Sequence, residues 1–224
     1  MSRRLLLPFL LLLLAAPAGA DTLLTIRSSI EGLKDQPQPG AVKIWIDGDK
    51  LRRDEGESSY VLRLDRGKLY VINHVEKTFS TLSVPGDLQK IVSPLAMQLK
   101  VQVTATKETK KVGSWNARKY KVDISNAAGL RLDTTIWASK DVASYQSYNR
   151  LAASLAALQP GAADWSRQLE TIEGFPVIQE AEVQMGGSRF KTREELVSVE
   201  TQEAPAGAYE PPAGYAAQAF GEGQ

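Results

Sequence analysis

Between Gly40 and Val84 the chain consists of short runs in which apolar and polar residues alternate, with only turn residues between the runs. Alternation with a period of two places every second side chain on the same face of a β-strand. The turns Asp47-Gly48-Asp49 and Asp65-Arg66-Gly67 supply the short polar side chains and the glycines that tight hairpin connections need. The pattern predicts an antiparallel meander of five strands: Ala41–Asp47, Leu51–Asp54, Ser59–Asp65, Lys68–Val75 and Lys77–Ser83.

The same alternation recurs on both sides of the meander. It predicts further strands at Asp21–Ser29, Lys100–Thr109, Trp115–Ile124, Gly129–Ala138, Phe175–Met185 and Arg189–Glu200, which gives about ten or eleven strands in all. One run, from Lys68 to Asn73, is apolar on both sides. A sheet with one face in water alternates more cleanly than this. Part of the second face is therefore predicted to be covered.

Three amphipathic stretches predict about three helices that could cover a sheet. The first begins near Pro85-Gly86-Asp87 and restarts at Ser93-Pro94. The second runs from about Val142 to Leu158, with Tyr145, Tyr148, Leu151, Leu155 and Leu158 in one apolar stripe. The third runs from Ala162 to Glu173, and Gly174 suits its C-terminal cap.

The two ends of the chain differ in composition from the middle. Residues 1–20 combine Arg3 and Arg4, an apolar run and the small residues Ala18-Gly19-Ala20, a pattern typical of a secretory signal peptide cleaved after Ala20. Residues 21–203 are predicted to form a single β-domain. Residues 204–224 are rich in Pro, Gly and Ala and predict an extended strap or tail.

Cysteine usage and charge narrow the compartment and the partners. The chain has no cysteine, and export without disulfides favours a bacterial periplasm. Without Arg3 and Arg4 the chain carries 25 basic and 26 acidic residues, so its net charge offers no electrostatic footprint for nucleic acid or for an anionic membrane. No stretch after the signal peptide is long and apolar enough to predict a stable membrane span.

The sequence offers few residues for catalysis or metal binding. His74 is the one histidine, and it is interpreted as a turn residue that is exposed or hydrogen-bonded. The acidic turn at Asp47 is explained by hairpin chemistry rather than by calcium. We therefore expect no catalytic residue, no metal and no cofactor, and an enzyme is the least favoured class.

A basic cluster and a set of aromatic residues are the remaining candidates for binding. The cluster at Lys107, Lys110, Lys111, Arg118, Lys119 and Lys121 could contact anionic headgroups, although protection of a strand edge against aggregation is the favoured interpretation. Five aromatic residues are the predicted ligand-binding set, with plain packing between helices and sheet as the alternative. They are Trp45, Tyr70, Trp137, Tyr145 and Tyr148.

Several phrases of the sequence resemble an uncharacterised family of exported bacterial proteins that is thought to share the LolA/LolB-like fold of lipoprotein carriers. The phrases are Ile44–Arg52, Leu64–Ile72, Glu76–Phe79, Gly174–Val177 and Tyr209–Tyr215. The resemblance implies a mainly β (α+β) protein, a curved antiparallel half-barrel with about three helices over its concave face. It also implies a hydrophobic cavity between sheet and helices, as in the carriers, where such a cavity takes up acyl chains. No functional residue of the carriers can be aligned to this chain.

The resulting hypothesis is a non-enzymatic periplasmic protein that binds a hydrophobic ligand, such as a lipid, an acyl chain or a lipoprotein. The alternative is a cell-envelope interaction or structural module that engages a protein partner through a strand edge or the C-terminal tail. The protein partner of that alternative is unknown from the sequence.

Overall fold

The computed structural model describes residues 20–32, 40–84, 86–87, 99–157, 167–185 and 187–220. The predicted signal peptide, apart from Ala20, and most of the first predicted helix lie outside these residues. Within the part of the chain that is described, no helix is long and apolar enough to cross a membrane.

The described chain forms one sheet of twelve strands. Neighbouring strands are antiparallel, except that the last strand pairs in parallel with its neighbour. The strands are β1 (Asp21–Glu31), β2 (Ala41–Asp47), β3 (Lys50–Glu55), β4 (Ser58–Arg63), β5 (Lys68–Asn73), β6 (Thr78–Ser83), β7 (Lys100–Val112), β8 (Trp115–Ser125), β9 (Arg131–Ser139), β10 (Phe175–Met185), β11 (Ser188–Gln202) and β12 (Ala216–Ala217). Their order across the sheet is β12-β6-β5-β4-β3-β2-β1-β11-β10-β9-β8-β7. The sheet is open, with β7 at one edge and the short β12 at the other.

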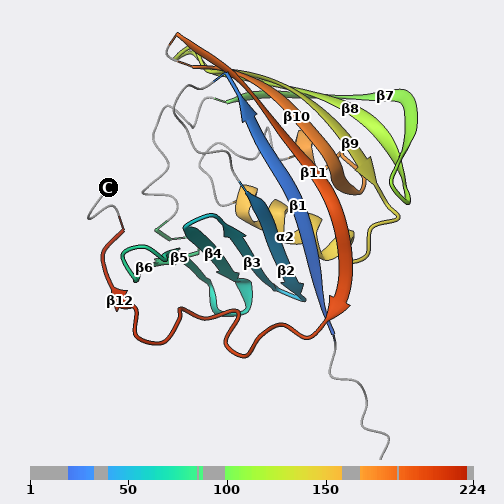
Figure 1. The fold of residues 1–224 in the computed structure, drawn as a ribbon. Coiled ribbons are helices and arrows are strands. Elements are labelled where there is room, and N and C mark those ends of the chain that lie inside the picture. The colour runs from blue at the N-terminus through green and yellow to red at the C-terminus, as the bar shows by residue number, and fades with distance from the viewer. Residues whose placement is uncertain are drawn as a thin grey trace, which may run out of the picture.

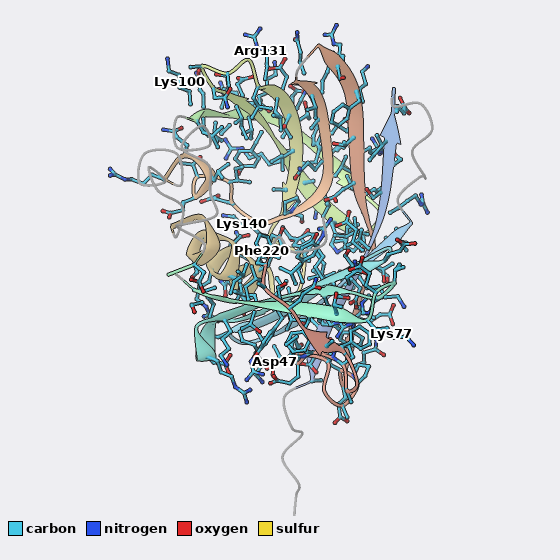
Figure 2. The ribbon with its side chains drawn as sticks, turned by 90° about the vertical axis from the view of Figure 1, so that its left-hand side faces the viewer. Asp47, Lys77, Lys100, Arg131, Lys140 and Phe220 are labelled. Carbon is cyan, nitrogen blue, oxygen red and sulfur yellow. The ribbon has the colours of Figure 1, made fainter. Side chains whose placement is uncertain are left out.

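The sheet bends so that β2–β6 and β7–β11 form two groups of strands at a large angle, joined through the long strand β1 (Figure 1). The α-helix α2 (Tyr145–Ala157) lies inside this bend. Figure 2 shows the same arrangement from the side, with Asp47 in one group and Lys100 and Arg131 at the far end of the other. The helix and the bend together define an inner face of the sheet, which contacts α2, and an outer face, which does not.

The main core lies on the inner face. Leu24, Ile44 and Leu62 point to this side from β1, β2 and β4, and Leu151 reaches it from α2; all four side chains are at most 2% exposed. Complete burial of each such side chain contributes about 1.5–3 kcal/mol to folding. A second group on the same face, built around Tyr120 and Ile136, packs against Leu169 and Ile172 of the segment after α2.

The C-terminal segment crosses the outer face of β2–β6. Residues 204–217, the strap, end in β12, where Ala216 N donates a hydrogen bond to Lys77 O and Gln218 N donates one to Phe79 O, both at 2.9 Å. The strap residues Tyr209 and Tyr215 pack on a cluster formed by Val61, Tyr70 and Ile72. The apolar residues on both sides of the run Lys68–Asn73 predict that part of the second sheet face is covered. In the structure the strap covers this part of the outer face.

The sequence predictions of the elements need four corrections. The sheet has twelve strands instead of ten or eleven, because two residues of the Pro/Gly-rich strap pair with β6. The run predicted as a strand to Asp65 ends at Arg63 and continues as a 3₁₀ helix, η1 (Leu64–Arg66), closed by Gly67 at φ 59°.

The helix predicted from Val142 begins at Tyr145, because Ser144 has a left-handed φ of 62°. Of the third predicted helix, Ala162–Glu173, the described part is helical only at residues 167–169 and then turns. Within the described residues, the inner face is therefore covered by α2 and by the short segment that precedes β10, and not by three full helices.

Candidate functional site

An apolar cavity of about 350 Å³ lies between α2 and the segment that leads into β10. Its apolar walls come from Tyr148, Ala152 and Ala153 on one side and from Leu169, Ile172, Gly174 and Pro176 on the other, and its polar lining residues are Asn149, Arg150 and Glu170. A cavity of this size, lined mainly by apolar side chains with few polar groups, is in the range of ligand sites.

The position of α2 follows from contacts at its start and its middle. Thr22 Oγ1 of β1 lies 2.6 Å from Ser144 Oγ, which fixes the residue before the helix to the sheet. One turn on, the ring of Tyr148 meets Phe175 edge to face, with 4.7 Å between ring centroids. Leu151, another turn along, is fully buried in the core. These contacts anchor the helix while Ala152 and Ala153 face the cavity with small side chains.

The opposite wall depends on a close backbone approach at Gly174. Its φ is +111°, and a Cβ at this position would lie 2.5 Å from the carbonyl carbon and oxygen of Ser139. No residue other than glycine fits such a contact. The neighbouring Glu173 is held by its backbone N–H, which donates to the Tyr120 hydroxyl at 3.3 Å, and by an ion pair with Lys140 at 2.6 Å.

An ion pair on the inner face lies beside the cavity. Arg53 of β3 reaches Glu194 of β11 at 2.8 Å and Glu55 at 3.0 Å. Burial lowers the pKa of the Arg53 guanidinium, but its hydrogen bonds with Glu55 and Glu194 outweigh this, so the net pKa is raised. Burial raises the pKa of the Tyr148 phenol, with opposing effects from Arg53 and Glu194. At neutral pH the wall residue Tyr148 is therefore uncharged.

The five predicted ligand-binding residues lie in three different places. Trp45 and Tyr70 belong to one row of the outer face and lie under the strap. Trp137 lies on the outer face near the other edge, where Lys110 Nζ is 4.0 Å from the ring centroid. Tyr145 and Tyr148 are on α2 and pack against the main core, which the Trp137 ring also contacts. Of the five, only Tyr148 lines the cavity, so the structure does not bring the set together.

Most residues that shape the cavity lie outside the predicted ligand-binding set. Ala153, Gly174 and Pro176 leave room by being small or by bending the chain, and alternation patterns register large apolar side chains instead. The available signals were the alanine pairs of the Leu151–Ala157 run and the Gly174-Phe175-Pro176 phrase.

A polar chain under the strap accounts for His74. His74 Nε2 is 2.6 Å from Ser59 Oγ, and its Nδ1 is 3.0 Å from the Tyr215 hydroxyl. Ser59 donates its single proton to Asp54, because an ionised carboxylate only accepts. His74 Nε2–H therefore donates to Ser59, and a second hydrogen bond joins His74 Nδ1 and the Tyr215 hydroxyl. Of the two predicted alternatives for His74, an exposed or a hydrogen-bonded turn residue, the structure shows the hydrogen-bonded one. The Ser59 side chain is fully buried, so its hydroxyl is not presented to solvent.

Charged contacts hold the strap at its other end. The Arg63 side chain is 7% exposed and forms ion pairs with Asp65 and Glu210. These contacts raise the pKa of the Arg63 guanidinium, and the hydrogen bond with Asp65 has the largest effect. Asp21 accepts from Ala204 N at 2.7 Å and from the Tyr209 hydroxyl at 3.1 Å. Burial raises the pKa of Tyr209, and Asp21 raises it further. The described part of the C-terminal tail is thus engaged with its own sheet.

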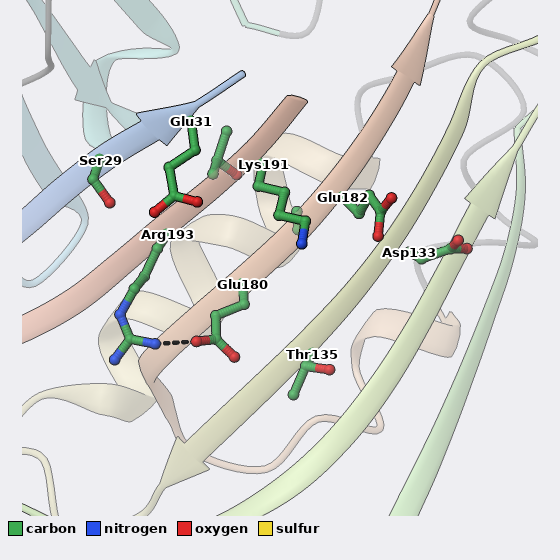
Figure 3. A pocket seen from close by; sticks show the side chains of 10 residues that line it. Ser29, Glu31, Asp133, Thr135, Glu180, Glu182, Lys191 and Arg193 are labelled. Atoms are coloured by element: carbon green, nitrogen blue, oxygen red, sulfur yellow. Dashed lines mark hydrogen bonds and ion pairs between the residues drawn. The ribbon is translucent and has the colours of Figure 1, made fainter. Parts of the chain in front are cut away.

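A second pocket, of about 390 Å³, lies on the outer face of β1 and β9–β11. Figure 3 shows that charged side chains line it, with Arg193 paired to Glu180. Arg193 also pairs with Glu195 at 3.0 Å, and Glu182 pairs with Arg189. Such rows of alternating charge are typical of a solvated sheet face. Among the described residues, no group of three or more His, Cys, Asp or Glu is placed to hold a metal ion.

The fold and the cavity together define a class: an open, bent antiparallel sheet with a helix in the bend and an apolar cavity beneath it. The family model described as "Domain of unknown function (DUF4412)" matches residues 49–215, and the chain belongs to this family. The prediction of an uncharacterised family is thereby confirmed, and the open curved sheet is the architecture that the resemblance implied. A comparison with curated proteins finds no match.

Three solved structures illustrate the similarity to known folds. A structure of PNGF-II is 13% identical with a TM-score of 0.42, and the match covers 90% of this chain but only 31% of that one. A DUF1329 family protein from Desulfovibrio piger is 8% identical with a TM-score of 0.35, over 87% of this chain and 91% of that one. A domain from Vibrio parahaemolyticus, assigned to outer membrane lipoprotein sorting, is 5% identical with a TM-score of 0.32, over 83% and 87%.

Proposed function

We propose that this is an exported, periplasmic and non-enzymatic protein that binds a hydrophobic ligand, such as a lipid or an acyl chain, in the cavity between α2 and the segment before β10. The observation that carries the proposal is the apolar cavity of about 350 Å³ on the helix-covered face of the sheet. The leader-like residues 1–20 support export.

The volume of the cavity limits the ligand. A methylene group takes roughly the volume of a water molecule in the liquid, about 30 Å³. The cavity of about 350 Å³ then holds on the order of twelve methylenes, which is one acyl chain of medium length and not a two-chain lipid in full. Each buried methylene contributes about 0.8 kcal/mol, so twelve contribute about 10 kcal/mol, which is comparable to the cost of association of about 4–15 kcal/mol.

Mass spectrometry of the protein purified from bacterial envelopes tests the proposal. The native protein should carry an extractable lipid or acyl compound in stoichiometric amount. Ala153→Trp places an indole in the cavity and should abolish the bound species, because the added side chain occupies the volume that the ligand needs.

Gln146→Trp is the matched control, since Gln146 is exposed on the same helix and does not line the cavity. It should retain the ligand. Absence of any bound compound from the native protein, with no binding of added acyl compounds, would contradict the proposal. Equal lipid content in the two tryptophan variants would show that the ligand binds at a site other than this cavity.

A further inference from the structure

The hairpin β7–β8 carries a charge that the rest of the chain does not share. Residues 100–125 contain seven Lys or Arg and two Asp or Glu, whereas the remaining sequence contains 20 basic and 24 acidic residues. The hairpin lies at the opposite edge of the sheet from the strap (Figure 1). The molecule thus has one basic end and an otherwise acidic body, and such segregation orients it in an electric field.

Protection of a sheet edge explains only part of this charge. Lysines on an edge strand prevent another strand from pairing there, and β7 is an edge strand. However, Arg118, Lys119 and Lys121 lie on β8, which is paired on both sides by β7 and β9 and has no free edge. Lys119 pairs with Glu108 at 3.0 Å, and Arg118 Nε donates to the Thr106 carbonyl oxygen at 2.9 Å. These contacts position two of the cations, but neither they nor edge protection accounts for the exposed Lys121 or for the net positive charge of the hairpin.

The cations point to both faces of the hairpin. Lys119 lies in the row of Trp137 on the outer face, while Arg118, one residue earlier, points to the inner face. Lys110 Nζ and Lys119 Nζ lie 4.0 and 5.7 Å from the Trp137 ring centroid. A partner that contacts both sets of cations has to meet the hairpin edge-on.

The edge itself is poorly suited to binding an added peptide strand. The ladder between β7 and β8 shifts register between Ala105 and Thr109, and such bulges distort the edge that a strand would need. Lys107, Lys110, Lys111, Arg118 and Lys121 are all exposed. Within the described residues, no ion pair involves Lys107, Lys111 or Lys121. A diffuse anionic surface fits this arrangement better than a β-strand does.

We infer that the β7–β8 hairpin is a docking surface for an anionic lipid bilayer, which the protein contacts edge-on through Lys107, Lys110, Lys111, Arg118 and Lys121. Juxtamembrane lysines and arginines are attracted to anionic lipids additively, and aromatic rings such as that of Trp137 suit the headgroup region. The acidic remainder of the molecule is repelled by the same surface, so the hairpin is turned toward the membrane.

The docking surface is continuous with the wall of the apolar cavity. Asn116, at the start of β8, donates from its backbone N to Asp141 at 2.9 Å in the connection from β9 to α2. Lys140 of that connection forms an ion pair with Glu173. The pKa of the Glu173 carboxyl is lowered, mainly by Lys140 and to a smaller extent by Arg118. Glu173 lies between the cavity residues Ile172 and Gly174. A bilayer at the hairpin is thus close to the place where a lipid would enter.

Sedimentation with vesicles tests the inference on the purified, ligand-free protein. It should pellet with phosphatidylcholine vesicles that contain phosphatidylglycerol, stay in solution with pure phosphatidylcholine, and be released by high salt. The triple variant Lys107→Gln, Lys111→Gln, Lys121→Gln removes three exposed cations. Each lysine contributes about 1 kcal/mol to binding of an anionic surface. Because about 1.4 kcal/mol corresponds to a tenfold change in affinity, the triple variant should bind roughly 100-fold more weakly.

The matched control is Arg27→Gln, Lys43→Gln, Lys68→Gln, which removes three exposed cations outside the hairpin and changes the net charge equally. It should bind anionic vesicles like the native protein. Failure of the native protein to bind phosphatidylglycerol vesicles, or equal weakening in both triple variants, would overturn the inference. Because the assay needs no ligand in the cavity, its failure is distinguishable from failure of the proposed lipid binding.

Discussion

Leu151→Ala tests whether α2 is anchored on the sheet as the cavity requires. Leu151 is 0% exposed and packs in the main core. The substitution removes three carbon groups, which costs about 2.4 kcal/mol at 0.8 kcal/mol each, and the space left behind brings the total to about 3 kcal/mol, within the range of about 2–5 kcal/mol for buried leucines. This is a large part of the usual stability of a domain, about 5–15 kcal/mol.

Equilibrium urea unfolding followed by circular dichroism measures the loss. The midpoint should fall by an amount equivalent to about 3 kcal/mol at an unchanged slope. Gln146→Ala, at an exposed position of the same helix, should change the free energy of unfolding by less than about 0.5 kcal/mol. If Leu151→Ala costs less than about 1 kcal/mol, the helix is not packed on the sheet in solution, and the cavity wall that depends on it is lost with it.

Two further predictions concern the strap and the second cavity wall. Burial and Asp21 raise the pKa of Tyr209, so the folded state favours the neutral phenol. This contribution to the free energy of unfolding is complete below a pH of about 10 and is lost as the pH rises further. Tyr209→Phe should therefore reduce the loss of stability at alkaline pH, as measured by urea unfolding at pH 8–11. An unchanged alkaline slope would count against the contact. Gly174→Ala should destabilise by at least about 2 kcal/mol because its Cβ meets Ser139, whereas Gly129→Ala, at φ +88° with nothing within 4 Å, should cost only about 1 kcal/mol. Equal costs would show that the close approach is absent.

The strands and hairpins were largely predictable because their signals are local. Turn residues such as Gly48 and Gly67 have the positive φ that the hairpins need, and β10 has the predicted bounds. The strap was harder to predict, because its last strand is held by two backbone hydrogen bonds, from Ala216 N to Lys77 O and from Gln218 N to Phe79 O, that no side-chain pattern encodes.

The candidate site was less predictable than the fold. Alternation assigns Trp45 and Ile44 to opposite faces, but it does not tell which face meets the helix and which meets the strap. The aromatic residues were therefore grouped by type, and three of the five lie on the outer face. The cavity depends on small residues and on a backbone contact at Gly174, which become visible only in three dimensions.

The affinity of the ligand-free protein for saturated fatty acids of increasing length, measured by calorimetry, tests the cavity most directly. The affinity should rise about fourfold per methylene, from about 0.8 kcal/mol each, and level off near twelve methylenes, where a volume of about 350 Å³ is filled. Ala153→Trp should shift the plateau to shorter chains or abolish binding. Absence of binding at every length, or a rise that continues unchanged well beyond twelve methylenes, would contradict a cavity of this size as the ligand site.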